Sequence, residues 1–277
     1  MFEKVLLPID FSEQSMMMFD CVMELKHFGT KEAFLLYVTG KGEDKTPEQN
    51  KLLENLISNL KDTGIEAKVI HKEGDPVDKI LEAAKEEKVT LISMASSGKG
   101  RTRELLVGST SFGVLRSSKK PVLIDKFKVT EKGGKRIVRA ACTTIFQRAI
   151  VPVDFTECSD RVLQLVPRLC RVGLGEVILF HVVESSKYNV RDGARFKAVT
   201  EKLDKLREDL RSNGCNVSTH VHFGTVSYNI LEATRELDAT LIVLGAHGKS
   251  LLREMTLGGN SEEVIRKAEI PLLVIPC

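Results

Sequence analysis

The chain has 277 residues, of which 42% are hydrophobic and 29% are charged, and its formal net charge is +3. This length suits two domains of ordinary size, and the composition is that of a globular chain that buries hydrophobic cores, which excludes a disordered protein. Because no apolar run approaches the roughly 20 residues that cross a bilayer, we expect neither a membrane-spanning nor a signal-bearing secreted protein, and we predict a cytoplasmic location.

Apolar runs and helical periodicity alternate along the first half of the chain. Four of the five apolar runs are continuous, which is typical of a parallel sheet buried on both faces. Right-handed crossovers then give an open, doubly wound α/β layer with helices on both faces. In chain order, we predict strands at 5–9, 34–38, 67–71, 90–94 and 121–124, and helices at 13–28, 47–62, 76–86 and 109–117.

The second half of the chain repeats the first. Residues 4–15 (KVLLPIDFSEQS) return as residues 148–159 (RAIVPVDFTECS), and residues 80–83 (ILEA) return as residues 230–233. The offsets are 144 and 150, and a period of this length is a domain duplication and not a solenoid. The predicted fold class is therefore α/β with two duplicated doubly wound domains, each a five-stranded parallel sheet, at residues 1–126 and 146–277.

The basic charge is concentrated between the two copies. Residues 126–140 hold six Lys or Arg and one Glu, which sum to +5 and leave −2 for the rest of the chain. A nucleic-acid binder of this size would spread such charge over a folded face, so nucleic acid is not an expected partner. We expect residues 127–145 to be a solvated basic linker.

The six cysteines stand at positions 21, 142, 158, 170, 215 and 277, and no two form a Cys-x-x-Cys pair. This spacing argues against a disulfide framework and against a zinc knuckle, so buried reduced thiols are expected. Cys158 and Cys170 are twelve residues apart on one predicted helix, too far apart to bridge each other. His220 and His222 could hold a metal from one side of a strand, but no third ligand is near, and no metal site is predicted.

Each first strand ends in a Pro-x-Asp motif. Doubly wound sheets bind ligands beyond the carboxyl ends of their strands, and a carboxylate there can accept hydrogen bonds from ribose hydroxyls or from an exocyclic amine. In the alternative interpretation the Asp caps the next helix, a role for which Ser12 or Thr156 competes. The repetition of the Asp favours a site, whose residues are Pro8, Ile9 and Asp10 in one copy and Pro152, Val153 and Asp154 in the other.

A glycine loop follows each fourth strand. Glycines let backbone N–H groups approach an anion, and a helix that begins there favours phosphate at its positive end. The second copy has Gly245-Ala-His-Gly248 and, nine residues later, Gly258; the first has Ala95-Ser-Ser-Gly98 and then Gly108. Hydroxyls follow at the helix start, namely Ser109, Thr110 and Ser111 in the first copy and Ser261, after Gly259 and Asn260, in the second.

With these motifs, both copies resemble the universal stress protein family, whose signature is Gly-x2-Gly-x9-Gly-[Ser/Thr] after the fourth strand with an Asp ending the first. The resemblance covers roughly 1–126 and 146–277 and implies the adenine nucleotide α-hydrolase-like fold. For members that carry the signature it implies binding of ATP or AMP, with Mg as a companion of ATP. It further implies that Pro-x-Asp and the valine of the second strand, Val38 or Val182, embrace adenosine. Met94 and Leu244, just before the loops, belong to the same predicted sites.

Both copies depart from the signature. Ala95 replaces the first glycine in the first copy, which would hinder the backbone if that position needs a positive φ. Gly259 stands where the second copy should have a hydroxyl, which Ser261 partly replaces. We predict that the second copy binds an adenine nucleotide and that the first binds it equally well or more weakly.

The chain lacks a Gly-x-Ser-x-Gly elbow, and no nucleophile stands beside an assigned base, so no catalytic residue is predicted and ATP hydrolysis should be slow or absent. The prediction is a nucleotide-responsive regulatory or stress-protective binding protein. Two alternatives stay open. One is a non-nucleotide interaction scaffold whose domains pair through their last strands within the chain. The other is a weak ATPase. The partners expected beside the nucleotide are an unidentified protein and, in a homodimer, a second copy of the chain.

Overall fold

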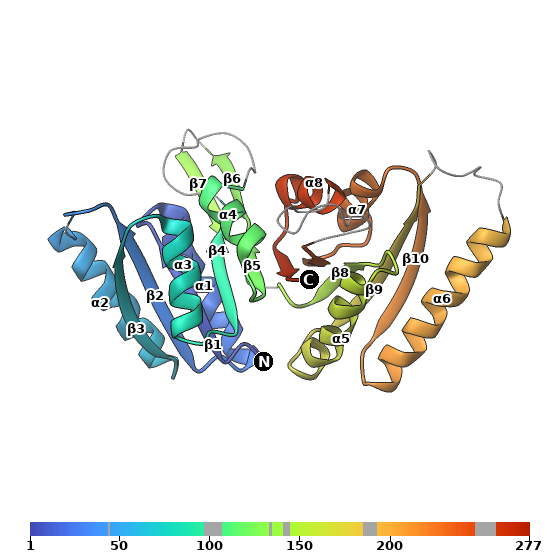
Figure 1. Ribbon diagram of the computed structural model, residues 1–277, viewed down its shortest axis with the longest axis horizontal. Coiled ribbons are helices and arrows are strands. Elements are labelled where there is room, and N and C mark those ends of the chain that lie inside the picture. The colour runs from blue at the N-terminus through green and yellow to red at the C-terminus, as the bar shows by residue number, and fades with distance from the viewer. Residues whose placement is uncertain (44, 97–106, 133–134, 141–144, 185–192, 247–258) are drawn as a thin grey trace. The chain divides into compact units, whose positions relative to one another are not determined.

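A computed structural model describes residues 1–43, 45–96, 107–132, 135–140, 145–184, 193–246 and 259–277 (Figure 1). The chain divides into two compact units, Met1–Thr143 and Thr144–Cys277. Each unit contains five parallel strands with helices on both faces, so the predicted fold class is confirmed. None of the helices in the described part of the chain combines the length and the apolar character that crossing a bilayer requires.

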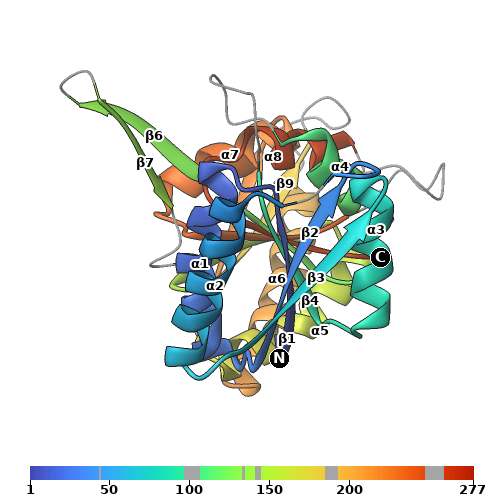
Figure 2. The same ribbon diagram turned by 90° about the vertical axis from the view of Figure 1, so that its left-hand side faces the viewer.

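Unit 1 follows the predicted alternation of strands and helices. Its strand order is β5-β4-β1-β2-β3, and all neighbours are parallel. The strands are β1 (Lys4–Ile9), β2 (Glu32–Thr39), β3 (Glu66–Glu73), β4 (Leu91–Ala95) and β5 (Val122–Asp125). The helices are α1 (Glu13–Leu25), α2 (Pro47–Asp62), α3 (Pro76–Glu86) and α4 (Ser109–Ser117). Figure 2 shows α1 and α2 on one face of this sheet and α3 on the other.

Local signals explain where the helices of unit 1 begin and end. Thr46 and Gln49 form a capping box at the start of α2, and Asp75 caps α3 through the backbone N–H groups of Val77 and Asp78. The helix predicted for 13–28 ends at Leu25 and continues as a 3-10 turn, Lys26–Phe28, which Gly29 closes at a φ of 90°. A left-handed residue of this kind ends helices, and glycine adopts that conformation without a Cβ penalty.

Unit 2 repeats this arrangement with the order β10-β9-β8-β11-β12, again with parallel neighbours. Its strands are β8 (Arg148–Pro152), β9 (Glu176–Val183), β10 (Val217–Phe223), β11 (Leu241–Gly245) and β12 (Leu272–Ile275). Its helices are α5 (Glu157–Arg171), α6 (Gly193–Ser212), α7 (Val226–Glu236) and α8 (Gly259–Lys267). In both units the strand order reverses between the first and fourth strands, which is where sheets of this class bind ligands.

The segment that we expected to be a solvated linker instead contains a β-hairpin. Its strands β6 (Phe127–Lys132) and β7 (Lys135–Ala140) pair antiparallel, and β7 contacts α1 of unit 1. Residues 133–134 and 141–144 of that segment lie outside the described residues. Val129 is opposite Val138 and Glu131 is opposite Arg136. The net charge of the segment does not report this backbone pairing.

The expectation of reduced thiols is wrong for unit 2. Cys158 is disulfide-bonded to Cys277 and Cys170 to Cys215, with Cα–Cα distances of 5.2 and 5.4 Å. As predicted, Cys158 and Cys170 do not bridge each other, because they lie near opposite ends of α5. Their partners come from other elements, 119 and 45 residues away, so the spacing of cysteines along the chain could not reveal the pairs.

Candidate functional site

Unit 1 contains a cavity of about 300 Å³ at the carboxyl ends of β1, β2 and β4. Ten of the eleven residues predicted for this copy line it: Pro8, Ile9, Asp10, Val38, Met94, Ala95, Gly108, Ser109, Thr110 and Ser111. The eleventh, Gly98, lies outside the described residues. The topology therefore brings together residues that are up to about a hundred positions apart in the sequence.

Four further lining residues escaped the sequence analysis, namely Ser15, Leu36, Pro76 and Ile80. Leu36 lies two positions before Val38, so the two side chains point to the same face of β2. Pro76 and Ile80 lie one turn apart at the start of α3. Ile80 begins one of the repeated sequence blocks, and that repetition together with helical spacing could have identified it.

The turn after β1 shows which residue caps α1. Its Oδ1 accepts hydrogen bonds from the backbone N–H of Ser12 at 3.0 Å and from the Ser12 hydroxyl at 2.5 Å. The Ser12 Oγ in turn accepts from the backbone N–H of Ser15 at 3.2 Å. Ser12 therefore caps α1, and Asp10 fixes Ser12 while its carboxylate lines the cavity.

The corresponding turn of unit 2 has the same hydrogen bonds. Asp154 Oδ1 accepts from the backbone N–H of Thr156 at 3.1 Å and from its hydroxyl at 2.6 Å. The residue after each Asp has a left-handed backbone, with φ of 58° at Phe11 and 60° at Phe155. Bulky residues rarely adopt this conformation, and it persists where surrounding contacts hold it. Both copies thus keep a strained turn that presents a carboxylate at the strand end.

An aromatic or imidazole ring supports each of these turns, and the sequence analysis did not identify it. In unit 2 the His181 Nδ1 lies 2.6 Å from the Val153 carbonyl oxygen, and its ring lies 5.0 Å from that of Phe155. In unit 1 the ring of Tyr37, at the equivalent strand position, lies 5.4 Å from that of Phe11. These contacts hold the Asp-Phe turns against the second strand of each sheet.

On the other side of the cavity, the first turn of α4 offers hydrogen-bond donors. Its N-cap is Gly108, and no side chain of the described residues caps the helix. The Gly108 N–H already donates to the Ser96 carbonyl at 2.6 Å, and the Ser111 hydroxyl donates to the Ala95 carbonyl at 2.9 Å. The N–H groups of the first helical residues have no acceptor within their own helix and carry the positive end of its dipole. Ser109 and Thr110 in that turn line the cavity, so this wall suits an anion.

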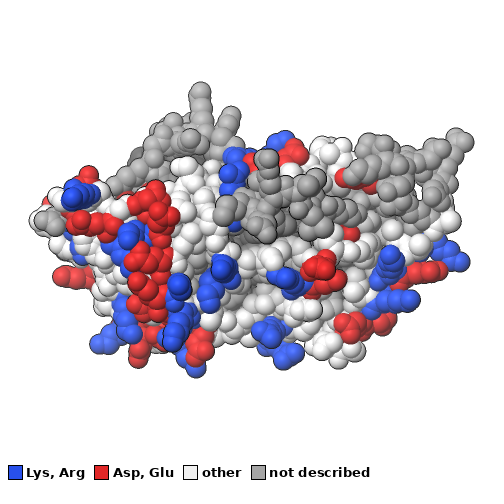
Figure 3. All heavy atoms as spheres, viewed as in Figure 1, with Lys and Arg blue, Asp and Glu red and all other residues white. Residues whose placement is uncertain are grey.

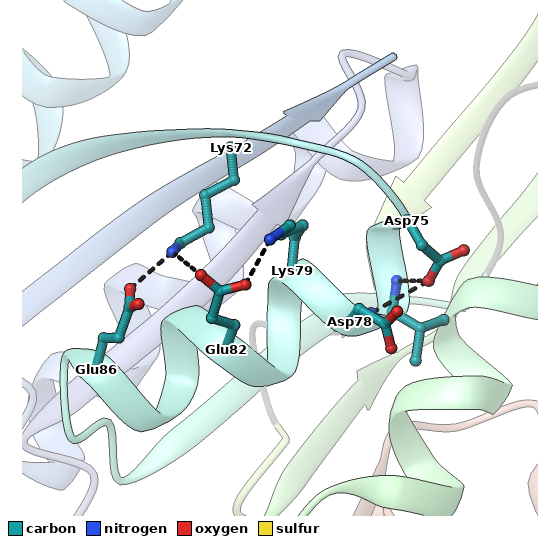
Figure 4. A network of polar contacts seen from close by, with 7 residues as sticks. Lys72, Asp75, Asp78, Lys79, Glu82 and Glu86 are labelled. Carbon is teal, nitrogen blue, oxygen red and sulfur yellow. Dashed lines mark hydrogen bonds and ion pairs between the residues drawn. The ribbon is translucent and has the colours of Figure 1, made fainter. Parts of the chain in front are cut away.

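Ion pairs lie along the helix that forms a third wall. Lys72 of β3 contacts Glu82 and Glu86 of α3 at 2.8 and 2.7 Å, and Lys79 contacts Glu82 at 2.6 Å (Figure 4). Hydrogen bonds from Lys72 and Lys79 lower the pKa of Glu82 to about 2. Acidic and basic side chains lie side by side over α3 (Figure 3). The network links α3 to β3 at the surface, while the buried apolar side chains of α3 hold the helix against the sheet beside the cavity.

In unit 2 the described members of the predicted site gather at one edge of the sheet. Pro152, Val153 and Asp154 end β8 or follow it, Val182 lies near the end of β9, and Leu244 and Gly245 end β11. Gly259, Asn260 and Ser261 begin α8. Gly248 and Gly258 lie outside the described residues.

The sequence pattern that defines the universal stress protein family matches residues 1–126 and 146–276. The chain belongs to the universal stress protein family. The two matched regions show that it carries the family domain twice.

Similar proteins agree with this assignment. Universal stress protein MJ0577 of Methanocaldococcus jannaschii is 31% identical over 157 residues, which cover 46% of this chain and 97% of that protein. Universal stress protein YxiE of Bacillus subtilis is 32% identical over 147 residues, which cover 45% of this chain and 99% of that protein. Among solved structures, a universal stress protein from Archaeoglobus fulgidus has a TM-score of 0.71 and 28% identity, covering 99% of this chain and 96% of that one.

One departure from the signature of the universal stress proteins causes no backbone strain. Ala95 is the last residue of β4 and is not among the described non-glycine residues with a positive φ. The concern that a side chain at this position hinders the backbone therefore does not apply to the conformation seen. The other departure remains: Gly259 begins α8 and supplies no hydroxyl to its first turn.

Proposed function

We propose that this universal stress protein binds an adenine nucleotide, ATP or AMP, at the carboxyl edge of each sheet, and acts as a nucleotide-responsive regulatory or stress-protective binding protein. The observation that carries the proposal is the cavity of unit 1. It sets the Asp10 carboxylate on one side and the uncapped first turn of α4 on the other. The first suits donors of a nucleoside, and the second suits phosphate.

The walls and size of the cavity suit a nucleoside. Leu36, Val38, Ile80 and Met94 supply apolar surface between the two polar walls. Its volume of about 300 Å³ is formed by described residues alone and lies at the lower end of the range for ligand pockets. We infer that the base and ribose occupy the part near Asp10 and that the phosphates reach Ser109 and Thr110.

The chemistry of the lining favours binding over hydrolysis. Asp10 is the one ionisable side chain among the described lining residues, and its Oδ1 is already engaged by Ser12. The described residues hold no group of three His, Cys, Asp or Glu that could bind a metal ion. A Mg ion would therefore arrive with the phosphates of ATP, and we infer that any hydrolysis is slow.

The affinity of unit 2 should equal or exceed that of unit 1. Unit 2 keeps the signature glycine Gly245 where unit 1 has Ala95, but it has Gly259 where unit 1 has the hydroxyl of Ser109. We infer that unit 2 binds the nucleotide and that unit 1 binds it equally well or more weakly.

Isothermal titration of the full chain with ATP and with AMP tests the proposal. Asp10→Asn and Asp154→Asn remove the negative charge from one unit each and keep the shape of the side chain. Each should weaken one class of site by about tenfold, since a hydrogen bond to a charged group contributes about 1.5–3 kcal/mol. Glu3→Gln, in a surface ion pair with Lys31 and absent from the cavity lining, is the matched control and should bind as the wild type does. Absence of saturable binding of either nucleotide by the wild type would refute the proposal and leave the interaction scaffold as the better interpretation.

A further inference from the structure

The two disulfides of unit 2 lie at opposite ends of the same helix. Cys158 is in the first turn of α5 and bonds to Cys277, two residues beyond β12. Cys170 is in the last turn of α5 and bonds to Cys215, which precedes β10. One helix thus places two otherwise similar bonds in opposite electrostatic settings.

We propose that Cys158 and Cys277 form a reversible redox site, which dithiol reductants open and hydroperoxides close, whereas Cys170–Cys215 is a permanent cross-link. The proposal does not depend on nucleotide binding. It rests on the accessibility of the sulfur atoms and on the position of each cysteine along α5.

Accessibility favours attack on the Cys158–Cys277 bond. Thiol–disulfide exchange requires a thiolate to reach one sulfur of the bond. Cys277 is exposed, while its partner Cys158 is 7% exposed. In the second bond, Cys215 is 6% exposed and Cys170 is half-buried. Cys277 is therefore the most exposed of the four cysteines, with its Sγ 3.6 Å from the Ile275 carbonyl oxygen.

The helix favours departure of the other sulfur. When a thiolate bonds to the Cys277 sulfur, the S–S bond breaks and Cys158 leaves as a thiolate. The positive end of a helix stabilises a thiolate, and the negative end destabilises it. Cys158 lies at the first of these ends. In the second bond the half-buried Cys170 is the more accessible sulfur, so Cys215 would leave, and Cys215 follows the end of α6 and gains no such stabilisation. The second thiol of the reductant then displaces Cys277, which completes a two-electron reduction.

The charged groups around Cys158 include a cation, which stabilises a thiolate there, and two anions, which destabilise it. The Arg161 guanidinium, one turn along α5, donates a hydrogen bond to the Cys277 carbonyl oxygen and so brings a cation to the pair. Glu157 and Asp160, on the same turns, are exposed and solvated. Arg161 is exposed as well, and the exposed Arg168 and Arg171 stand in the last turn beside Cys170. Because water screens the charges at both ends of α5, the helix end itself is what distinguishes Cys158.

The same geometry supports re-oxidation. The Cys158 thiolate attacks the O–O bond of a hydroperoxide, forming a sulfenic acid and releasing an alkoxide or hydroxide that takes up a proton. The Cys277 thiol then displaces the sulfenic oxygen as water, and the disulfide forms. The Cα–Cα distance of 5.2 Å is within the range for disulfides, so the second step requires no movement of the backbone.

Differential alkylation of the native full chain tests the opening step. The protein is exposed to graded dithiothreitol, quenched at intervals with one alkylating reagent, then fully reduced and labelled with a second, and each cysteine is quantified by peptide mass spectrometry. Cys158 and Cys277 should become reduced faster than Cys170 and Cys215 by about tenfold or more. Equal rates, or faster opening of Cys170–Cys215, would overturn the proposal.

Sulfenic acid trapping tests the closing step with matched variants. After reduction and hydrogen peroxide treatment, dimedone should label Cys158 in Cys277→Ser, and should label Cys170 in Cys215→Ser far less. Equal labelling of the two residues would contradict the proposed role of the helix ends. Circular dichroism of both variants establishes that they are folded, and the rates on wild type stand even if one variant is not.

Discussion

The buried carboxyl group of Asp125 makes the stability of unit 1 depend on pH. Asp125 is 1% exposed, and its Oδ2 accepts a hydrogen bond from the Ser93 hydroxyl at 3.1 Å. Its Oδ1 has no hydrogen-bond partner among the described residues. Burial raises the pKa of Asp125 from 3.8 to about 7, although the hydrogen bond from Ser93 lowers it. The equivalent positions of unit 2 are the apolar Val243 and Ile275, so this fold does not require the acid.

The raised pKa fixes the sign and size of the effect. Between the unfolded and folded pKa values the folded state holds a proton that the unfolded state has released, so stability falls as pH rises from about 4 to about 7. With about 1.4 kcal/mol for each pKa unit, the destabilisation by Asp125 grows by about 2–3 kcal/mol between pH 5 and pH 8. Asp125→Asn cannot ionise, so its stability relative to the wild type should rise by that amount over the same interval.

Urea unfolding at pH 5 and pH 8 measures this difference. Hydrogen-exchange mass spectrometry of β4 and β5 peptides reads unit 1 separately from unit 2. Any constant cost of the amide side chain cancels in the comparison of the two pH values, and Ile275→Val, at the equivalent position, should show no such change. A variant whose stability relative to wild type is the same at both pH values would refute the reasoning about Asp125.

Two further substitutions test packing and cross-linking, and a third tests a helix end. In Gly113→Ala the new Cβ would lie 2.7 Å from Val77 Cγ2, so unit 1 should lose about 1–3 kcal/mol of stability. Adding Val77→Ala should restore that stability. An unchanged melting temperature of Gly113→Ala would contradict the reasoning. Cys170→Ser opens a cross-link across 45 residues, and the chain-entropy estimate gives a loss of stability of about 4 kcal/mol. Denaturant titration of the oxidised proteins should show this loss, whereas under reducing conditions the variant and the wild type should have the same stability. Gly29→Ala forces a side chain into a φ of 90° and should cost about 1 kcal/mol in the same titration; a stabilised variant would contradict that assignment of the helix end.

Much of the fold could be predicted because each unit buries a sheet between helices. That environment imposes continuous apolar strands and one-sided helices, which the sequence displays directly. The cavity could be predicted for a related reason: residues that end parallel strands share one edge of the sheet, so Asp10, Val38 and Met94 meet although the chain separates them. The duplication also helped, because a residue that recurs in both copies is more readily recognised as part of a site than a residue that serves one copy only.

The remaining features depend on contacts between distant segments. The pairing of Cys158 with Cys277 requires knowing that β12 ends beside the first turn of α5. The hairpin from Phe127 to Ala140 depends on cross-strand register, which net charge does not report. The lining residue Pro76 comes from a helix that packs on the sheet through buried Ile80, Ala83 and Ala84. Local periodicity carries none of this information.

Hydrogen-exchange mass spectrometry of the full chain with and without ATP tests the central claim most directly. Nucleotide binding at the strand ends predicts slower exchange in peptides that cover the Asp-Phe turns, residues 8–15 and 152–159, and the first turns of α4 and α8. The same measurement on Asp10→Asn should lose the protection in unit 1 and keep it in unit 2. Exchange that is unchanged at those four segments at saturating ATP, or protection confined to other parts of the chain, would contradict the proposed site.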